Sequence, residues 1–162
     1  MNKIKQVLFV CLGNTARSPV AEYLARHYAN KFDIDVKFDS CGFFNAFSYM
    51  QPESRLYLDS KGIDHANFRP KIISIELLGK QDLILTMENK HSEEIKSNFN
   101  TLQGIGNKTY TLKEFTGENN DLDIIDPYYT STDTYKKVLK IIEKYVKKAV
   151  LKIGQINNSI CV

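Results

Sequence analysis

The chain alternates short apolar runs with longer segments in which apolar residues recur every three or four positions. An apolar run at residues 7–10 is typical of a buried strand, and the apolar residues spaced through 20–32 fall on one face of a helix. Residues 134–153 carry apolar residues on one helical face and lysines on the other. Strands that alternate with helices in this way predict a parallel sheet covered by helices on both faces.

The same patterns set the limits of the predicted elements. The four strands are predicted at residues 6–10, 36–40, 82–87 and 109–112. The four helices are predicted at residues 19–32, 52–61, 89–99 and 134–153. A long loop covers residues 114–134, and Gly154 is expected to end the last helix. We therefore predict a single α/β domain over residues 1–162, with a four-stranded parallel sheet and a binding site at the carboxyl ends of its strands.

The loop after the first strand has the composition of an anion site. It reads Cys11-Leu12-Gly13-Asn14-Thr15-Ala16-Arg17-Ser18-Pro19. Gly13 and Asn14 tolerate a left-handed backbone, and a serine followed by a proline suits the start of a helix. Loop N–H groups, the helix dipole and Arg17 can together bind a phosphate. That positive potential favours the thiolate of Cys11, which is placed to attack phosphorus. A lone cysteine after an apolar strand is more often a core residue, but the full string is far more specific.

This string resembles the signature of the low-molecular-weight protein tyrosine phosphatases, V-C-x-G-N-x-C-R-S-P, and differs at Ala16, where most members carry a second cysteine. Residues 39–42, 52–55, 86–89 and 126–129 resemble the family's D-S-A-G, P-D-P-R, M-D and D-P-aromatic segments. The resemblance implies hydrolysis of phosphotyrosine in proteins through a phosphocysteine, with no cofactor and no metal. It further implies that Asn14 braces the loop with help from Ser40, while Leu12 to Ser18 bind the substrate phosphate.

Asp126 is the candidate general acid. A tyrosine leaves phosphorus as a phenolate unless a group protonates it, and a general acid is worth ~10²–10⁴-fold in rate. Asp126 stands in the predicted long loop before Pro127 and two tyrosines. Asp-Pro is a common turn dipeptide, so this aspartate alone favours a turn. The phosphate loop and the match to the family's acid favour catalysis, whereas Asp121 and Asp123 lack the proline and aromatic context.

Aromatic residues are the candidate walls for an aryl phosphate. Tyr128 and Tyr129 follow the candidate acid, and Phe47 replaces the family's wall aromatic, which aligns with Ala46. Other wall candidates are Phe43, Phe44 and Tyr49. For any one of them, packing is the simpler interpretation. The three histidines are expected at the surface without a role.

Composition limits the partners. A net charge of +3 over 162 residues fits an anionic substrate and does not argue for nucleic acid. The three cysteines, Cys11, Cys41 and Cys161, lack metal-site spacing and favour a reducing compartment. No run approaches the ~20 apolar residues of a membrane span, and no signal peptide is recognised. We expect a cytoplasmic monomer whose partners are tyrosine-phosphorylated proteins and inorganic phosphate or other oxyanions.

Two other functions remain open. An arsenate reductase can be built on the same loop, but that chemistry needs two further cysteines for a disulfide cascade. A phosphotyrosine-binding module without turnover would need to have lost the nucleophile, the arginine or the acid, and all three are present.

Overall fold

Four parallel strands form the central sheet of the computed structural model, which describes residues 2–160. Their spatial order is β2-β1-β3-β4. The strands span Gln6–Cys11 (β1), Lys37–Gly42 (β2), Leu83–Thr86 (β3) and Thr109–Thr111 (β4). Every neighbouring pair is parallel, so the carboxyl ends of β1, β2 and β3 meet at one edge. The predicted sheet is confirmed.

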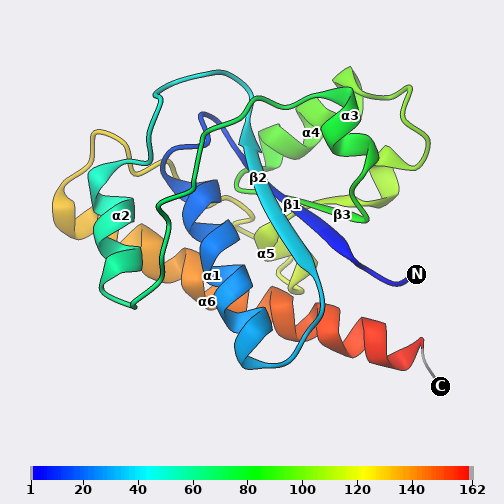
Figure 1. The fold of residues 1–162 in the computed structure, drawn as a ribbon. Coiled ribbons are helices and arrows are strands. Elements are labelled where there is room, and N and C mark those ends of the chain that lie inside the picture. The colour runs from blue at the N-terminus through cyan, green and yellow to red at the C-terminus, as the bar shows by residue number, and fades with distance from the viewer. Residues whose placement is uncertain (1, 161–162) are drawn as a thin grey trace.

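Helices cover both faces of this sheet, as predicted (Figure 1). Within residues 2–160 they are α1 (Arg17–Lys31), α2 (Pro52–Asp59), α3 (Ile75–Gly79), α4 (Asn89–Asn98), α5 (Leu112–Phe115), α6 (Thr132–Ser159) and the 3₁₀-helix η1 (Ile105–Asn107). α1 packs against α6 on one side, whereas α3 and α4 lie on the other.

The central strand β1 is buried on both faces. Val7, Phe9 and Cys11 belong to the hydrophobic cluster that contains α1 and α6. Leu8 and Val10 belong to a second cluster on the side of α3 and α4. Successive side chains of a strand point to opposite faces, so a strand covered on both faces needs the unbroken apolar run seen in the sequence.

Two short α-helices, α3 and α5, were not predicted from the sequence, and neither was the 3₁₀-helix η1. Local hydrogen bonds stabilise the start of both α3 and α5. At the start of α3, the hydroxyl of Ser74 accepts from the backbone N–H of Leu77. Before α5, Thr111 and Glu114 form a reciprocal capping box. Helices of four and five residues are too short for an apolar period to appear, so capping residues were the only signal in the sequence.

The prediction that Gly154 ends the last helix is wrong. α6 continues through it to Ser159. A Cβ built on Gly154 would lie 2.8 Å from the Cδ1 atom of Ile34, so glycine allows the segment after α1 to approach α6 closely. The residue therefore serves helix packing rather than helix termination.

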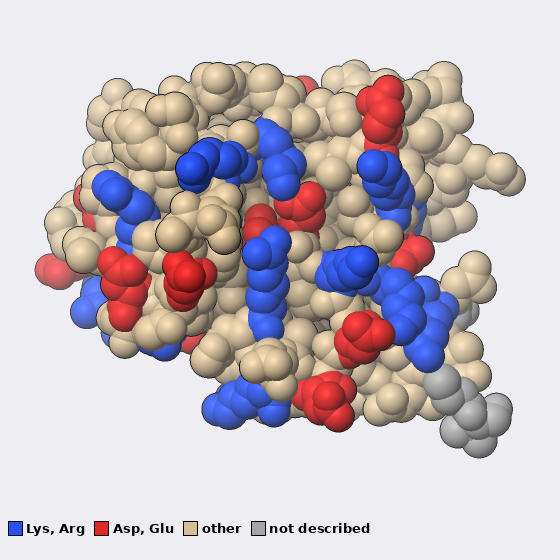
Figure 2. Space-filling model, in the orientation of Figure 1, with Lys and Arg blue, Asp and Glu red and all other residues tan. Residues whose placement is uncertain are grey.

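Charges of both signs are mixed on the face shown in Figure 2, in keeping with the small net charge. Basic side chains lie beside acidic ones rather than in one continuous field of a single sign. Between residues 2 and 160, no helix is both long and apolar enough to cross a membrane.

Candidate active site

The loop between β1 and α1 holds its shape through close backbone packing. Asn14 takes the left-handed conformation, with φ of 53°. Gly13 does not, which corrects its predicted role; a Cβ on Gly13 would lie 2.8 Å from the Cβ of Ala46. A Cβ on Gly42, at the end of β2, would lie 2.7 Å from the backbone nitrogen of Asn14. Glycines at these two positions therefore allow the neighbouring segments to close around the loop.

A buried hydrogen-bond network supports the loop from beneath. The side-chain amide of Asn14 donates to the Ser18 hydroxyl at 2.8 Å and to the Ser40 hydroxyl at 2.9 Å, and its oxygen accepts from the backbone N–H of Lys71 at 3.0 Å. Ser40 donates onward to Glu22 at 2.6 Å. Burial raises the pKa of the Glu22 carboxyl, although the hydrogen bond from Ser40 opposes this shift. Asn14 and Ser40 thus lie in contact, as the resemblance implied.

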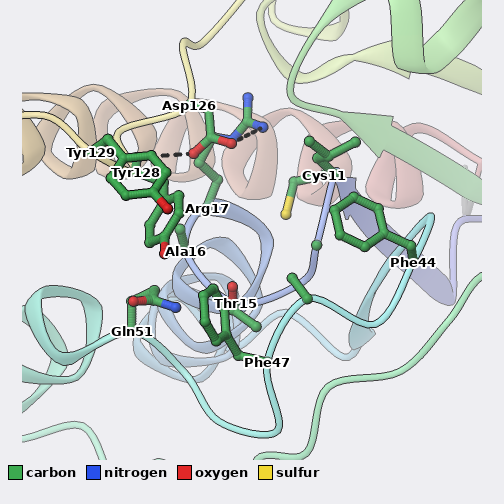
Figure 3. A pocket seen from close by; sticks show the side chains of 13 residues that line it. Cys11, Thr15, Ala16, Arg17, Phe44, Phe47, Gln51, Asp126, Tyr128 and Tyr129 are labelled. Carbon is green, nitrogen blue, oxygen red and sulfur yellow. Dashed lines mark hydrogen bonds and ion pairs between the residues drawn. The ribbon is translucent and has the colours of Figure 1, made fainter.

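Cys11 ends β1 at the floor of a cavity of about 280 Å³. Its Sγ atom lies 2.9 Å from the Ser18 hydroxyl oxygen. The Ser18 oxygen accepts from Asn14, and its one hydroxyl hydrogen has two acceptors in reach, the sulfur at 2.9 Å and the carbonyl oxygen of Cys41 at 3.4 Å. In Figure 3 the sulfur points into the space between Arg17 and Phe44.

Arg17 starts α1 and is 1% exposed. Its Nη1 donates to the carbonyl oxygen of Ile124 at 2.7 Å and lies 3.5 Å from the Glu88 carboxylate. Its Nη2 lies 3.6 Å from a second carboxylate, that of Asp126. The guanidinium is therefore oriented by groups from two distant loops. Arg17 lines the cavity, and its buried Nε atom has no hydrogen-bond partner among residues 2–160.

Asp126 lies on the opposite rim of this cavity from Phe44 (Figure 3). Its Oδ1 accepts from the backbone N–H of Tyr128 at 3.1 Å, which fixes the carboxyl on the loop. The rival Asp121 binds Lys113, and Asp123 accepts from the backbone N–H of Asn89 at 2.6 Å. Neither rival lines the cavity, so only Asp126 among the three is placed to reach a substrate.

The structure divides the predicted substrate-binding residues into two groups. One group lines the cavity: Leu12, Gly13, Thr15, Ala16, Phe47, Tyr128 and Tyr129. The other group, Asn14, Ser18 and Ser40, lies beneath the loop and does not line the cavity. The side chains of Asn14 and Ser40 therefore support the loop from beneath, and that of Ser18 also contacts the Cys11 sulfur.

Sequence reasoning missed two residues of this site: Gln51 lines the cavity, and Glu88 contacts Arg17. Of the other wall candidates, Phe44 lines the cavity, whereas Phe43 and Tyr49 do not. Gln51 immediately precedes the predicted helix 52–61, and its backbone N–H donates to the carbonyl oxygen of Thr15 at 2.8 Å, which ties α2 to the phosphate loop. For Glu88 a signal was available, because residues 86–89 match the family's M-D segment.

The expectation that all histidines lie at the surface is wrong for His91, which is 1% exposed. It lies in the first turn of α4, with its Nε2 3.1 Å from Glu88 and its ring 5.3 Å from the ring of Phe43. Burial lowers the pKa of His91 to about 4, and the positive charge of Arg17 acts in the same direction. His91 is therefore a neutral neighbour of the Arg17–Glu88 pair at neutral pH.

Comparison with known proteins places this site in a family. The model of the low molecular weight phosphotyrosine protein phosphatase family matches residues 6–158, and the chain belongs to that family. A protein-arginine-phosphatase of Bacillus subtilis is 31% identical over 146 residues, covering 88% of this chain and 92% of the relative. The low molecular weight protein-tyrosine-phosphatase PtpB of Staphylococcus haemolyticus is 32% identical over 136 residues, covering 83% and 90%.

Among solved structures, the YwlE arginine phosphatase with its active-site cysteine changed to a phosphorylated serine is similar to this fold. The TM-score is 0.83 at 30% identity, and the match covers 91% of this chain and 94% of that one. The protein is therefore a phosphatase of the low molecular weight family, and its relatives include enzymes named for tyrosine and for arginine.

The two described cysteines face opposite sides of the sheet. Val10 pairs with Cys41 in the register of β1 and β2, and Cys41 packs in the cluster of Leu8 and Val10. Cys11 packs in the cluster on the other face. A disulfide requires converging side chains, so Cys41 is not placed to bridge Cys11 or to serve an arsenate-reductase cascade. Burial raises the pKa of the Cys41 thiol, and Cys161 lies outside the described residues.

We expect peroxide inactivation to be poorly reversed by dithiothreitol. Ala16 stands where most family members carry the cysteine that can trap an oxidised nucleophile, so oxidised Cys11 remains a sulfenic acid open to irreversible further oxidation. The measurement is activity after peroxide and then dithiothreitol, with mass spectrometry of the Cys11 peptide. Ala16→Cys is the matched variant and should recover far more activity. Full recovery of the wild type with a linked Cys11–Cys41 peptide would contradict this expectation.

Proposed function

We propose that this protein hydrolyses phosphotyrosine in proteins, and small aryl phosphates, through a phosphocysteine intermediate. The observation that carries the proposal is the meeting of Cys11, Arg17 and Asp126 in one cavity. Aromatic side chains surround them: the rings of Phe47 and Tyr128 are 5.5 Å apart at the mouth. Such walls fit the ring of an aryl phosphate, while the loop and Arg17 fit its three phosphate oxygens.

The first step is an in-line displacement at phosphorus. The Cys11 thiolate forms the S–P bond as the P–O bond to the tyrosine oxygen breaks. Arg17 and the loop N–H groups stabilise charge on the equatorial oxygens. Asp126 gives its proton to the departing phenolic oxygen, so tyrosine leaves as the neutral phenol.

The second step hydrolyses the phosphocysteine and regenerates the free enzyme. A water molecule gives a proton to the Asp126 carboxylate as its oxygen bonds to phosphorus, and the S–P bond breaks. Inorganic phosphate leaves, and the sulfur departs as a thiolate that the Ser18 hydroxyl, 2.9 Å away, stabilises by donating a hydrogen bond. The phosphorylated active-site serine of the YwlE variant supports a covalent phosphoryl intermediate at this loop position.

Phosphoarginine is a second candidate substrate, favoured by the arginine phosphatase relative and by two polar side chains in the cavity wall. Thr15 offers a hydroxyl. Gln51 is 7% exposed, and its Nε2 has no hydrogen-bond partner among the described residues. Its amide can rotate without losing a bond and present its oxygen to the cavity. Both oxygens can accept from a guanidinium, whereas an aromatic ring offers them no donor.

One assay tests both candidates. Matched peptides carrying phosphotyrosine or phosphoarginine at one position are compared by kcat/KM, with Cys11→Ser as the inactive control. We expect the tyrosine peptide to be hydrolysed and Cys11→Ser to release no phosphate. Preference for the arginine peptide by tenfold or more would replace the first candidate with the second. In that case Thr15→Val should lower the preference, because a hydrogen bond to a charged group is worth about 1.5–3 kcal/mol.

A further inference from the structure

A second cavity, of about 240 Å³, lies directly behind one wall of the catalytic cavity. The wall is the segment 46–51. Ala46, Phe47 and Gln51 face the catalytic cavity. Residues 48–50 of the same segment line the second cavity. The Phe47 and Tyr49 rings, one from each side, have centroids 5.7 Å apart, so the two cavities share a thin aromatic wall.

The second cavity is basic. Its remaining lining includes Arg55 from α2 together with His65 and Arg69 from the following loop. Neither Arg55 nor Arg69 takes part in any of the ion pairs recorded among residues 2–160. The nearby carboxylates are already engaged: Asp59 contacts His65 at 2.7 Å, and Asp64 accepts from the backbone N–H of Ala66 at 3.0 Å. Two guanidinium groups therefore face one cavity with no carboxylate paired to either.

The loop holds one of these groups in a fixed position. Arg69 Nη1 donates to the carbonyl oxygens of Phe68, at 2.7 Å, and Ala66, at 3.3 Å. Phe68 is buried and packs edge-on against Tyr23, with ring centroids 6.2 Å apart. A guanidinium anchored through one nitrogen leaves its remaining N–H groups for an anion, and its planar fork suits a carboxylate or a phosphate.

We propose that this cavity is an anion subsite that binds an acidic side chain of the substrate protein, near the phosphorylated residue. The proposal rests on the proposed protein phosphatase activity. An extended chain advances 3.3–3.6 Å per residue, so a substrate crosses the wall between Phe47 and Tyr49 within about two or three residues. The bound group is an aspartate, a glutamate or a second phosphorylated residue at that separation. Arg55 and Arg69 thereby select among phosphoproteins, while the catalytic loop selects the phosphate.

The test compares phosphotyrosine peptides that are identical except at the positions two and three residues before and after the phosphotyrosine. One carries aspartate there, one carries phosphoserine and one carries asparagine. We expect wild type to prefer both anionic peptides by about tenfold in kcat/KM, and the preference to shrink as salt screens it. The larger of the two preferences identifies the natural anion.

The variant Arg55→Ala/Arg69→Ala should bring these ratios close to one. A ratio between peptides measured on one preparation does not depend on how much of the variant is active. Lys37→Ala/Lys80→Ala is the matched control: it removes two positive charges from exposed residues near the amino ends of β2 and β3, and should keep the preference. If the preference is absent in wild type or survives the double arginine variant, the subsite is wrong.

Failure of the proposed function is a separate result. Tyrosine peptides that are not hydrolysed, on a preparation that hydrolyses an aryl phosphate, would overturn phosphotyrosine as the protein substrate. The same flanking residues placed around phosphoarginine then give the same two ratios to the asparagine peptide. The subsite stands or falls on those ratios in either case.

Discussion

Replacing Arg17 by lysine should lower kcat/KM for an aryl phosphate by about 10³-fold, in the range known for arginines that stabilise a transferring phosphoryl group. The guanidinium is held by the carbonyl of Ile124 and by the carboxylates of Glu88 and Asp126. A lysine keeps the charge but cannot hold two phosphate oxygens in one plane. It also leaves two carboxylates facing a group of different shape.

The matched control for this change is Arg26→Lys on the same helix. Arg26 is half-exposed and pairs with Glu22 at 2.6 Å, away from the cavity. Glu22 also accepts from Ser40 beneath the loop, but lysine keeps the positive charge beside it, so we expect a small effect, within about threefold. Melting temperatures of both variants separate loss of folding from loss of catalysis. A folded Arg17→Lys enzyme whose kcat/KM falls by less than tenfold would contradict the proposed role of Arg17 in binding the phosphate.

The phosphate loop and the sheet could be predicted because their determinants are local. An apolar run buried on both faces, a left-handed Asn14 and an arginine at the first turn of α1 all act within a dozen residues. The relation between Asn14 and Ser40 came from the resemblance, and their contact is present at 2.9 Å. Local chemistry of this kind leaves a trace in the sequence that does not depend on the rest of the fold.

For the walls of the cavity, the sequence offered six aromatic candidates but could not say which of them line it. The walls come from segments 44–51 and 126–129, whose approach depends on how loops pack over the sheet edge. Gln51 gives no sequence signal for its place beside the loop, because its link to Thr15 is a backbone hydrogen bond. His91 looked like a polar residue of a polar helix, and its contacts with Glu88 and Phe43 were not visible along the chain. Gly154 resembled a helix end because the nearby Ile34 was not visible along the chain.

Removing the carboxyl of Asp126 should show whether it is the general acid. We expect Asp126→Ala to lower kcat by ~10²-fold or more on aryl phosphates with poor leaving groups. KM should stay the same or fall, since a carboxylate 3.6 Å from Arg17 no longer competes with the substrate phosphate for the guanidinium. The loss should shrink steadily as the leaving group becomes more acidic, because a phenolate that departs easily needs no proton.

Two further variants separate proton transfer from loop structure in that experiment. Asp126→Asn can still accept from the backbone N–H of Tyr128 but carries no acidic proton, so it should behave like alanine in kcat. Asp123→Asn keeps an acceptor for the backbone N–H of Asn89, and we expect nearly normal turnover because Asp123 does not line the cavity. An Asp126 effect of equal size across all leaving groups would mean that the carboxyl positions the loop or the substrate and does not donate the proton.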